Sequence, residues 1–168
     1  MIDSSVAGRI QTVLGPIYPK DLGVTLAHEH LLVDVSAWEG PPTNKRDLAL
    51  YDAPLSLENL GHVKHYHVPN LDNGRLDDVE IAIEEARLYA EWGGRSIIDV
   101  TSLGIGRNPR GLARISRETG LNVIMGSSYY LGEAHPADME DRSEDQIVNE
   151  IVRDVTVGVD GTTIKAGV

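Results

Sequence analysis

The sequence contains no cysteine and no phenylalanine, and only two tryptophans and six tyrosines among its 168 residues. Without cysteine there are no disulfides and no thiolate metal sites, which leaves histidine, aspartate, glutamate and modified side chains as metal ligands. With so few aromatic residues, the core must consist mainly of valine, isoleucine, leucine and alanine, as in many α/β proteins. The length fits a single domain or part of a larger one.

Basic residues are also scarce, because 15 lysines and arginines face 26 aspartates and glutamates, for a net charge of −11. This balance argues against a partner with a phosphate backbone and against an anionic membrane surface. The first residues lack the basic and apolar regions of a signal peptide, and no apolar run approaches the length of about 18 residues typical of a membrane span. The sequence therefore predicts a cytoplasmic protein with no nucleic-acid or membrane partner.

An apolar run over residues 24–35 contains two histidines separated by one residue, His28 and His30. In a strand, residues i and i+2 share a face at about 6–7 Å, so both imidazoles could reach one metal ion while Glu29 points away. The apolar flanks predict a parallel strand covered on both faces. Two histidines that merely form hydrogen bonds within a strand are the alternative, so the metal assignment needs support from elsewhere in the chain.

Strand and helix patterns alternate along the chain, which predicts parallel strands joined by right-handed crossovers. A small hairpin over about 8–23 precedes the histidine strand, and a long irregular loop over about 36–73 follows it. Turn residues, helix caps and apolar periodicity then predict helices over 76–92, 108–120 and 143–155 and strands over 95–101, 121–126 and 162–168.

Two folds fit this alternation, an open doubly wound sheet and a (β/α)8 barrel. His30 and Lys165 are 135 residues apart, whereas three average barrel units take about 93 residues. The excess nearly matches the loop over 36–73, so the chain fits the N-terminal half of a (β/α)8 barrel with four strands and one enlarged loop. Such a half barrel leaves sheet edges without hydrogen-bond partners. We therefore expect the chain to be a fragment of a longer protein or to pair with another chain, for example as a homodimer.

Four segments carry a resemblance to a known family: 23–31 with its His-Glu-His, 93–109 with Ile-Ile-Asp-Val-Thr, 119–126, and 161–167 with Ile-Lys-Ala-Gly. In this order the chain resembles the phosphotriesterase family of the amidohydrolase superfamily. The resemblance implies a (β/α)8 barrel and a hydrolase that acts on small organophosphate, lactone or other ester substrates. It also implies two divalent metal ions, with zinc expected, at the carboxyl ends of the strands.

The resemblance implies a role for three residues. His28 and His30 match ligands of the more buried metal, and Lys165 matches a lysine that is carbamylated and bridges both metals. A hydroxide shared by the metals is then the nucleophile. The family's remaining ligands, a histidine each from strands five and six and an aspartate from strand eight, are absent from the 168 residues. We therefore expect weak metal binding and no hydrolase activity from this chain alone.

Other polar residues follow the predicted strands at the same end of the sheet. Asp99 and Thr101 end the second strand and are candidates to orient the metal ligands through hydrogen bonds without binding the metal themselves. Tyr129, Tyr130 and His135 lie in the loop after the third strand and could line a substrate pocket. Hydrogen bonds at a strand end and ordinary loop packing are the respective alternatives.

The long loop contributes further candidates. Trp38 could cover the pocket from this loop. His62, His65 and His67 cluster in it, and surface histidines explain the cluster better than a metal site does. A non-catalytic half barrel that assembles with another chain or binds a small ligand is the alternative to the hydrolase.

Overall fold

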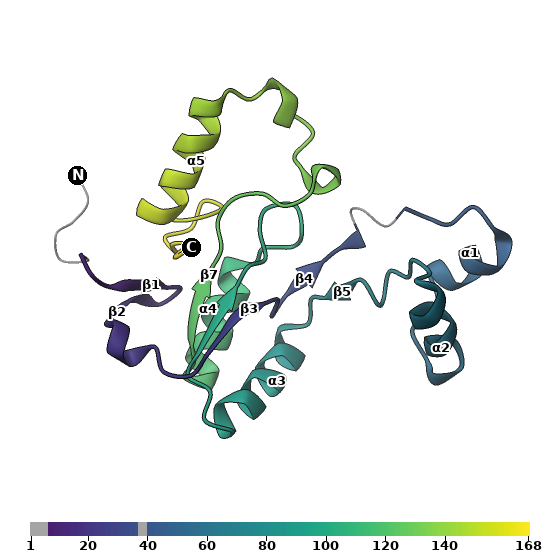
Figure 1. Ribbon diagram of the computed structural model, residues 1–168, viewed down its shortest axis with the longest axis horizontal. Coiled ribbons are helices and arrows are strands. Elements are labelled where there is room, and N and C mark those ends of the chain that lie inside the picture. Colours follow the sequence, from purple (N-terminus) through teal and green to yellow (C-terminus); the bar gives the residue numbers. More distant parts are fainter. Residues whose placement is uncertain (1–6, 37–39) are drawn as a thin grey trace.

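The computed structural model describes residues 7–36 and 40–168. Short 3-10 turns lie at 19–21, 132–134 and 139–141. In chain order the strands and α-helices are β1 (Ile10–Thr12), β2 (Gly15–Ile17), β3 (Thr25–Glu29), β4 (Val33–Asp34), α1 (Lys45–Tyr51), α2 (Leu57–Tyr66), β5 (Arg75–Leu76), α3 (Val79–Glu91), β6 (Ser96–Asp99), α4 (Pro109–Thr119), β7 (Asn122–Met125) and α5 (Glu144–Thr156). Figure 1 shows their arrangement.

A parallel sheet in the order β3-β6-β7 forms the centre of the molecule. The crossovers from β3 to β6 and from β6 to β7 contain α3 and α4, which lie along one side of the sheet (Figure 1). Ile97 and Val123 of the strands are buried against Ile83 of α3 and Ile115 of α4 in one hydrophobic core. The predicted α/β architecture with crossover helices is therefore confirmed.

Helix boundaries follow the capping signals in the sequence. The side chain of Asn108 accepts a hydrogen bond from the Gly111 amide at 2.9 Å to begin α4, and Gly120 ends it with a φ of 73°. Ser143 and Gln146 form the predicted capping box of α5. Among the residues described by the structure, no helix has the length and apolar character needed to cross a membrane.

The predicted N-terminal hairpin is present as the antiparallel pair β1 and β2. Its residue Val13 is buried, and the Val13 amide donates to the carbonyl of Val123 in β7 at 2.9 Å. The hairpin therefore contacts the free edge of β7 and occupies a carbonyl that a further strand would otherwise use.

The prediction of a fourth strand over 162–168 is wrong for most of its length, because no strand forms there. Only its end pairs with the sheet: the Gly167 amide donates to the Met125 carbonyl at 2.8 Å, and the Ser127 amide donates to the Val168 carbonyl at 2.8 Å. The Ala166 amide instead donates to the carbonyl of Asp154 in α5 at 3.0 Å. The hairpin and α5 therefore take the hydrogen bonds that a longer strand would need.

The prediction of an irregular loop over 36–73 is also wrong in part, because α1 and α2 form within it. Asn44 caps α1 by accepting from the Asp47 amide at 2.9 Å, and Ser56 and Asn59 form a capping box for α2. Asparagine at the last position of that box departs from the usual glutamate or glutamine. The antiparallel pair β4 and β5 closes the base of this excursion, and Figure 1 shows α1 and α2 well away from the sheet.

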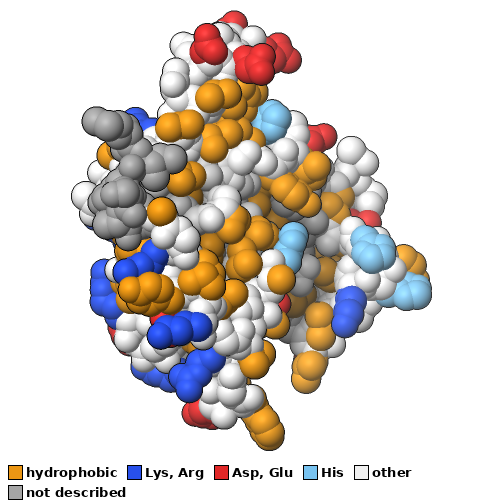
Figure 2. Space-filling view, turned by 60° about the vertical axis from the view of Figure 1, so that its left-hand side comes forward, with side chains coloured by type: hydrophobic (Ala, Val, Ile, Leu, Met, Phe, Trp, Pro, Cys, Tyr) orange, Lys and Arg blue, Asp and Glu red, His pale blue; other side chains and the backbone are white. Residues whose placement is uncertain are grey.

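The expectation that the histidine strand is covered on both faces is wrong as well. β3 is an edge strand in the described sheet, and the side chains of Val24 and Leu26 are 65% and 36% exposed. A space-filling view of one face shows hydrophobic side chains gathered across its centre (Figure 2). Apolar β-strand surface is therefore available for contact with further protein.

Candidate metal centre

The two histidines lie at the carboxyl end of β3. His28 belongs to the strand and is exposed, whereas His30 follows it and is half-buried. Their ring centroids are 5.6 Å apart, and the ring planes are inclined by 75°. Two imidazoles that bind one tetrahedral cation through bonds of about 2 Å would place their centroids about 5 Å apart. The observed spacing is close to the one that two ligands of a single ion require.

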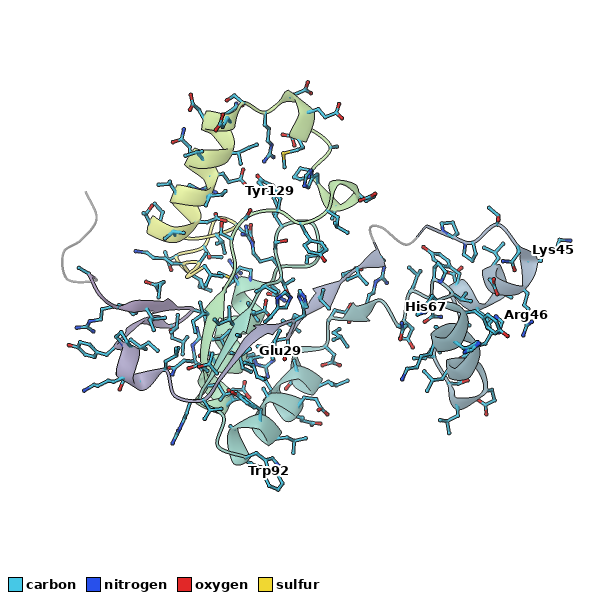
Figure 3. All side chains as sticks on the ribbon, viewed as in Figure 1. Glu29, Lys45, Arg46, His67, Trp92 and Tyr129 are labelled. Atoms are coloured by element: carbon cyan, nitrogen blue, oxygen red, sulfur yellow. The ribbon has the colours of Figure 1, made fainter. Side chains whose placement is uncertain are left out.

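A β-bulge sets the direction of these side chains. β3 and β6 pair Leu26 with Ile97 and Glu29 with Asp99, so β3 carries one extra residue between the two pairs. Paired residues point to the same face, and an extra residue reverses the alternation. After the bulge Glu29, labelled in Figure 3, therefore shares the face of Asp99, and the histidines on either side of it share the opposite face. On β3 this face is opposite the one on which Ile97 packs against α3 and α4.

Thr101 fixes the tautomer of His30. The Thr101 hydroxyl donates its only hydrogen to the Leu32 carbonyl at 3.0 Å, and its oxygen lies 2.9 Å from His30 Nδ1. With its hydrogen committed, the hydroxyl can only accept from the imidazole, so Nδ1 carries the proton. The neutral ring then keeps a free lone pair on Nε2, which is the form of histidine that binds metals.

Asp99 ties the loops after β3 and β6 together. This fully buried carboxylate accepts from the Leu31 amide at 2.7 Å and from the Thr101 amide at 3.0 Å. Burial raises the pKa of Asp99, and the Leu31 amide, the hydroxyl and amide of Thr101 and the neighbouring His30 offset this effect only in part. Asp99 therefore holds the backbone on both sides of the hydrogen bond between His30 and Thr101.

Lys165 is half-buried in the segment that leads to the end of β7. Within the described chain its ammonium has no hydrogen bond or ion pair. The backbone pairing places Gly167 beside the last residue of β7, so Lys165 precedes the level at which the strands end. The structure thus puts Lys165 in the predicted segment, two residues before its contact with the sheet edge.

The loop after β7 uses its polar groups for internal contacts. The Tyr129 hydroxyl accepts from Arg142 at 2.7 Å, and burial together with Glu150 raises its pKa. His135 contacts the Tyr129 ring edge to face at 5.9 Å and donates from Nε2 to the Tyr130 carbonyl at 3.3 Å. Tyr129, labelled in Figure 3, also forms a parallel β-bridge through its backbone with Leu103 of the loop after β6. Trp38, the other proposed pocket residue, lies outside the described residues.

The histidines of the long loop serve another purpose. His62 donates from Nε2 to Asp47 at 3.0 Å and accepts from Arg46 at 3.2 Å, so both of its ring nitrogens are occupied in the contact between α1 and α2. His67 lies in this region, away from Glu29 and Tyr129 in Figure 3. In residues 7–36 and 40–168, no three histidine or acidic side chains converge as a metal site. His28 and His30 therefore fit a cation as two of its ligands, and further ligands are required.

A pocket of about 390 Å³ opens beside His30, between β5 and α3. Its lining includes Leu31 and Ile81 together with the charged residues Asp77 and Arg75. Arg75 is already paired with Asp34 at 3.1 Å. The pocket therefore offers room for a small molecule next to one of the two histidines.

Two buried charged residues were not predicted from the sequence. The side chains of Arg107 in the loop after β6 and Asp154 in α5 are each 3% exposed and lie 2.8 Å apart. One signal could have identified Asp154, because it interrupts the apolar stripe that Ile147 and Ile151 form on the predicted helix. A charged residue at a core position requires a partner, and here that partner comes from a distant loop.

Comparison with known proteins identifies the class. The model of the phosphotriesterase family matches residues 8–168, so the chain belongs to the phosphotriesterase family. Its α/β fold is accordingly part of a (β/α)8 barrel. The resemblance carried by the four sequence segments is confirmed.

Individual relatives are similar along almost the whole chain. The N-acetyltaurine hydrolase of Xenopus tropicalis is 37% identical over 98% of this chain and 47% of its own length. The crystal structure of a resiniferatoxin-binding protein from Rhodobacter sphaeroides is 44% identical with a TM-score of 0.90, covering 96% of this chain and 45% of that one. The organophosphorus hydrolase from Deinococcus radiodurans is 26% identical with a TM-score of 0.64, over 99% and 44%. The chain thus spans about half the length of the relatives it matches.

Proposed function

We propose that this chain forms one side of the active site of a metal-dependent hydrolase, with His28 and His30 as ligands of a divalent cation. The observation that carries the proposal is the contact of 2.9 Å between His30 Nδ1 and the Thr101 hydroxyl, from which we infer that Nδ1 holds the proton and Nε2 keeps its lone pair for a cation. The separation of 5.6 Å between the two rings and membership in the phosphotriesterase family support the same assignment.

The side chains around the pair have distinct tasks in this proposal. When bound, two divalent cations, for which we propose zinc, supply a water acidic enough to attack at neutral pH and polarise the oxygen of the scissile group. His28 and His30 would hold the first cation. Thr101 orients the His30 ring, and Asp99 keeps the loop that carries His30 against β6.

Lys165 as a carbamylated, metal-bridging residue stays a prediction. An amine near two cations is driven toward its neutral, nucleophilic form, and the carbamate that results from carbon dioxide is an anionic oxygen ligand. The position of Lys165, two residues before the pairing of Gly167 with β7, puts it lower in the sheet than His30. A Lys165→Ala variant that binds zinc as well as wild type would remove Lys165 from the ligand set.

The proposed substrates are small molecules with an electrophilic phosphoryl or carbonyl centre. Esters, lactones and organophosphates follow from the family resemblance. The relatives named N-acetyltaurine hydrolase, at up to 37% identity, add N-acetyl amides to this class. All of these reactions develop negative charge on an oxygen in the transition state, which a divalent cation stabilises.

Zinc titration into the metal-free chain tests the metal site. We expect binding in wild type and at least about tenfold weaker binding in His28→Ala and His30→Ala, because each variant removes a ligand. His65→Ala is the matched control, since His65 is an exposed histidine that contacts Tyr66 at a distance from β3. Equal zinc affinity in wild type and in both ligand variants would contradict the metal site.

Turnover of N-acetyltaurine, a lactone and paraoxon then tests the reaction. It is measured for the 168-residue chain and for a longer protein that carries it, each with and without zinc. We expect hydrolysis of at least one substrate by the longer protein, lost in His28→Ala. Zinc binding without turnover of any acyl or phosphoryl substrate would contradict the hydrolase.

Binding of a small apolar molecule without chemistry is the second candidate function. It is favoured by the 44% identity to a protein named as resiniferatoxin-binding and by the pocket beside His30. Saturable binding of resiniferatoxin that is equal in wild type and His28→Ala, together with no turnover, would establish this candidate in place of the hydrolase.

A further inference from the structure

Asp154 connects three parts of the molecule although it is almost completely buried, with 2% of its surface exposed. Its carboxylate accepts from Arg107 Nη1 at 2.8 Å and from the Ser127 hydroxyl, just after β7, at 3.1 Å. Its backbone carbonyl accepts from the Ala166 amide at 3.0 Å. One residue of α5 is therefore bonded to the loop after β6, to the end of β7 and to the final segment.

Arg107 extends these contacts to the turn between α5 and the final segment. Its Nε and Nη2 donate to the two carboxylate oxygens of Asp160 at 3.1 and 2.7 Å, while Nη1 serves Asp154. Asp160 lies in the left-handed region with a φ of 50°, a conformation that an ordinary residue adopts at some cost. The bidentate pair thus holds this left-handed turn only five positions before Lys165.

The same loop after β6 supports the candidate metal ligands at its other end. Thr101 begins this loop and bonds His30, and Asp99 bonds the amide of Leu31. Further along the loop, the Ile105 carbonyl accepts from the Asp34 amide at 2.9 Å. One set of polar contacts thus joins the ends of β3 and β6, a second joins the loop after β6 to β7 and the final segment, and the backbone of that loop connects the two sets. We call Asp99, Thr101, Arg107, Ser127 and Asp154 the strand-end network.

Stability alone is a weak reason to build such a network. Burying a guanidinium with carboxylates carries a desolvation penalty that often equals the gain from their attraction, and apolar residues of similar size can be as stabilising. What an ionic network supplies is a defined geometry, because the bidentate and single hydrogen bonds are directional. In this molecule the defined geometry is that of consecutive strand ends, where a metal site in a barrel must be assembled.

We propose that Asp154 and Arg107 are positioning residues for the candidate metal site, which they reach through the strand-end network without contacting the metal. This inference rests on the proposed function, because it assigns the network to the site of His28 and His30. Loss of either residue is expected to alter the relative placement of the strand ends and thereby the affinity and geometry of the bound cation.

Cobalt titration of the metal-free chain, followed by visible absorption, tests this inference, since the d–d bands report the geometry around the ion. We expect Asp154→Asn and Arg107→Met to weaken cobalt binding by about 10–100-fold, the range found for residues that support metal ligands indirectly. Arg107→Lys should recover only part of the affinity, because an ammonium cannot bond both carboxylates as a fork. Arg114→Met is the matched control, since Arg114 is a partly exposed residue of α4 whose ion pairs, with Glu80 of α3 and Glu118 of α4, lie outside the strand-end network.

Thermal unfolding of the same variants separates positioning from stability. A lower Tm with wild-type cobalt affinity and an unchanged spectrum in Asp154→Asn would overturn the inference. Asp160→Asn is a milder variant that should still fold, because the Asp160 side chain is 36% exposed in its pair with Arg107. We expect it to weaken cobalt binding less than Asp154→Asn does. If the wild-type protein and His28→Ala both fail to bind cobalt, the result would instead contradict the proposed metal site itself and remove the basis of this inference.

Discussion

The hydroxyl of Thr101 decides which nitrogen of His30 is available to a ligand. It is 1% exposed and takes part in two hydrogen bonds, one as a donor to Leu32 and one as an acceptor from His30. A hydroxyl with only one hydrogen cannot donate in both directions, so the choice of tautomer follows from the backbone carbonyl it already serves. An exposed serine or threonine, free to rotate, would impose no such choice.

Replacement of Thr101 by valine keeps the shape and removes the hydroxyl. It leaves a buried carbonyl and the His30 Nδ1–H without partners, which should cost about 1–3 kcal/mol of unfolding free energy. It should also weaken zinc binding about 10–100-fold, because His30 can then turn or change tautomer. Urea unfolding and zinc titration measure the two effects, and Thr101→Ser should restore most of both.

Thr119→Val is the matched control for this experiment. Its hydroxyl donates to the Ile115 carbonyl at 2.7 Å at the end of α4, away from the histidines. It should lower stability without affecting zinc affinity. A Thr101→Val variant with unchanged zinc affinity would show that Thr101 does not orient His30 for metal binding.

At the scale of elements, the loop after β6 depends on two glycines that pack against other loops. Gly104 and Gly106 both have a φ of 90°, which side-chain-bearing residues rarely adopt. A Cβ at Gly104 would collide with the backbone carbonyl of Ala134, and one at Gly106 would lie 2.8 Å from the Asp34 amide. The loop is therefore fitted between the loops that follow β7 and β3.

Gly104→Ala and Gly93→Ala form a matched pair for this packing. Gly93 has a φ of 92° and no atom within 4 Å of a Cβ, so its variant measures backbone strain alone, about 1–2 kcal/mol. Gly104→Ala should lower the unfolding free energy by about 1–3 kcal/mol more than Gly93→Ala does, because Ala134 must move to make room for the new Cβ. Urea unfolding of both variants gives the difference, and equal losses would contradict the close packing of this loop.

At the scale of the whole molecule, apolar surface remains uncovered on several elements. Leu88 of α3 and Trp92, which directly follows this helix, are 51% and 90% exposed, and Val148 and Val152 of α5 are 49% and 53% exposed. Together with the exposed β3, these faces form apolar surface of the kind that marks a protein contact. Figure 2 shows how hydrophobic side chains spread over one side of the molecule.

We expect the 168-residue chain to associate with itself as its concentration rises, through this exposed apolar surface. Leu88→Lys combined with Trp92→Lys should increase the monomer fraction in size-exclusion chromatography with light scattering. Glu91→Lys, an exposed polar position one turn after Leu88, is the control for the added charge. Association unaffected by the double substitution would exclude this face of α3 as a contact surface.

Local signals predicted most of the fold. The cap at Asn108, the glycine stop at Gly120 and the capping box at Ser143 act over a few residues, so α4 and α5 can be read from the sequence. The two helices in 36–73 were missed because their periodicity is short and the box at Ser56 ends in asparagine. Helices of such length depend on context more than on propensity.

The candidate site divides in a similar way. The spacing of His28 and His30 and the family motifs indicated the histidine pair, and Asp99 and Thr101 followed from their place after a strand. Arg107 and Asp154 could not be paired from the sequence, because nothing local indicates that a loop arginine and a helix aspartate 47 residues apart will be buried together. The truncated pairing of 162–168 likewise depends on Val13, from the opposite end of the chain.

The sequence by itself determined the alternation of strands and helices, the family and the two histidines, since these depend on periodicity and short motifs. Only the tertiary structure decided the bulge that sets the face of the histidine pair, the tautomer of His30 and the strand-end network. The physical reason is that each of these depends on hydrogen bonds between residues far apart in the chain, whose partners exist only once the strands lie side by side.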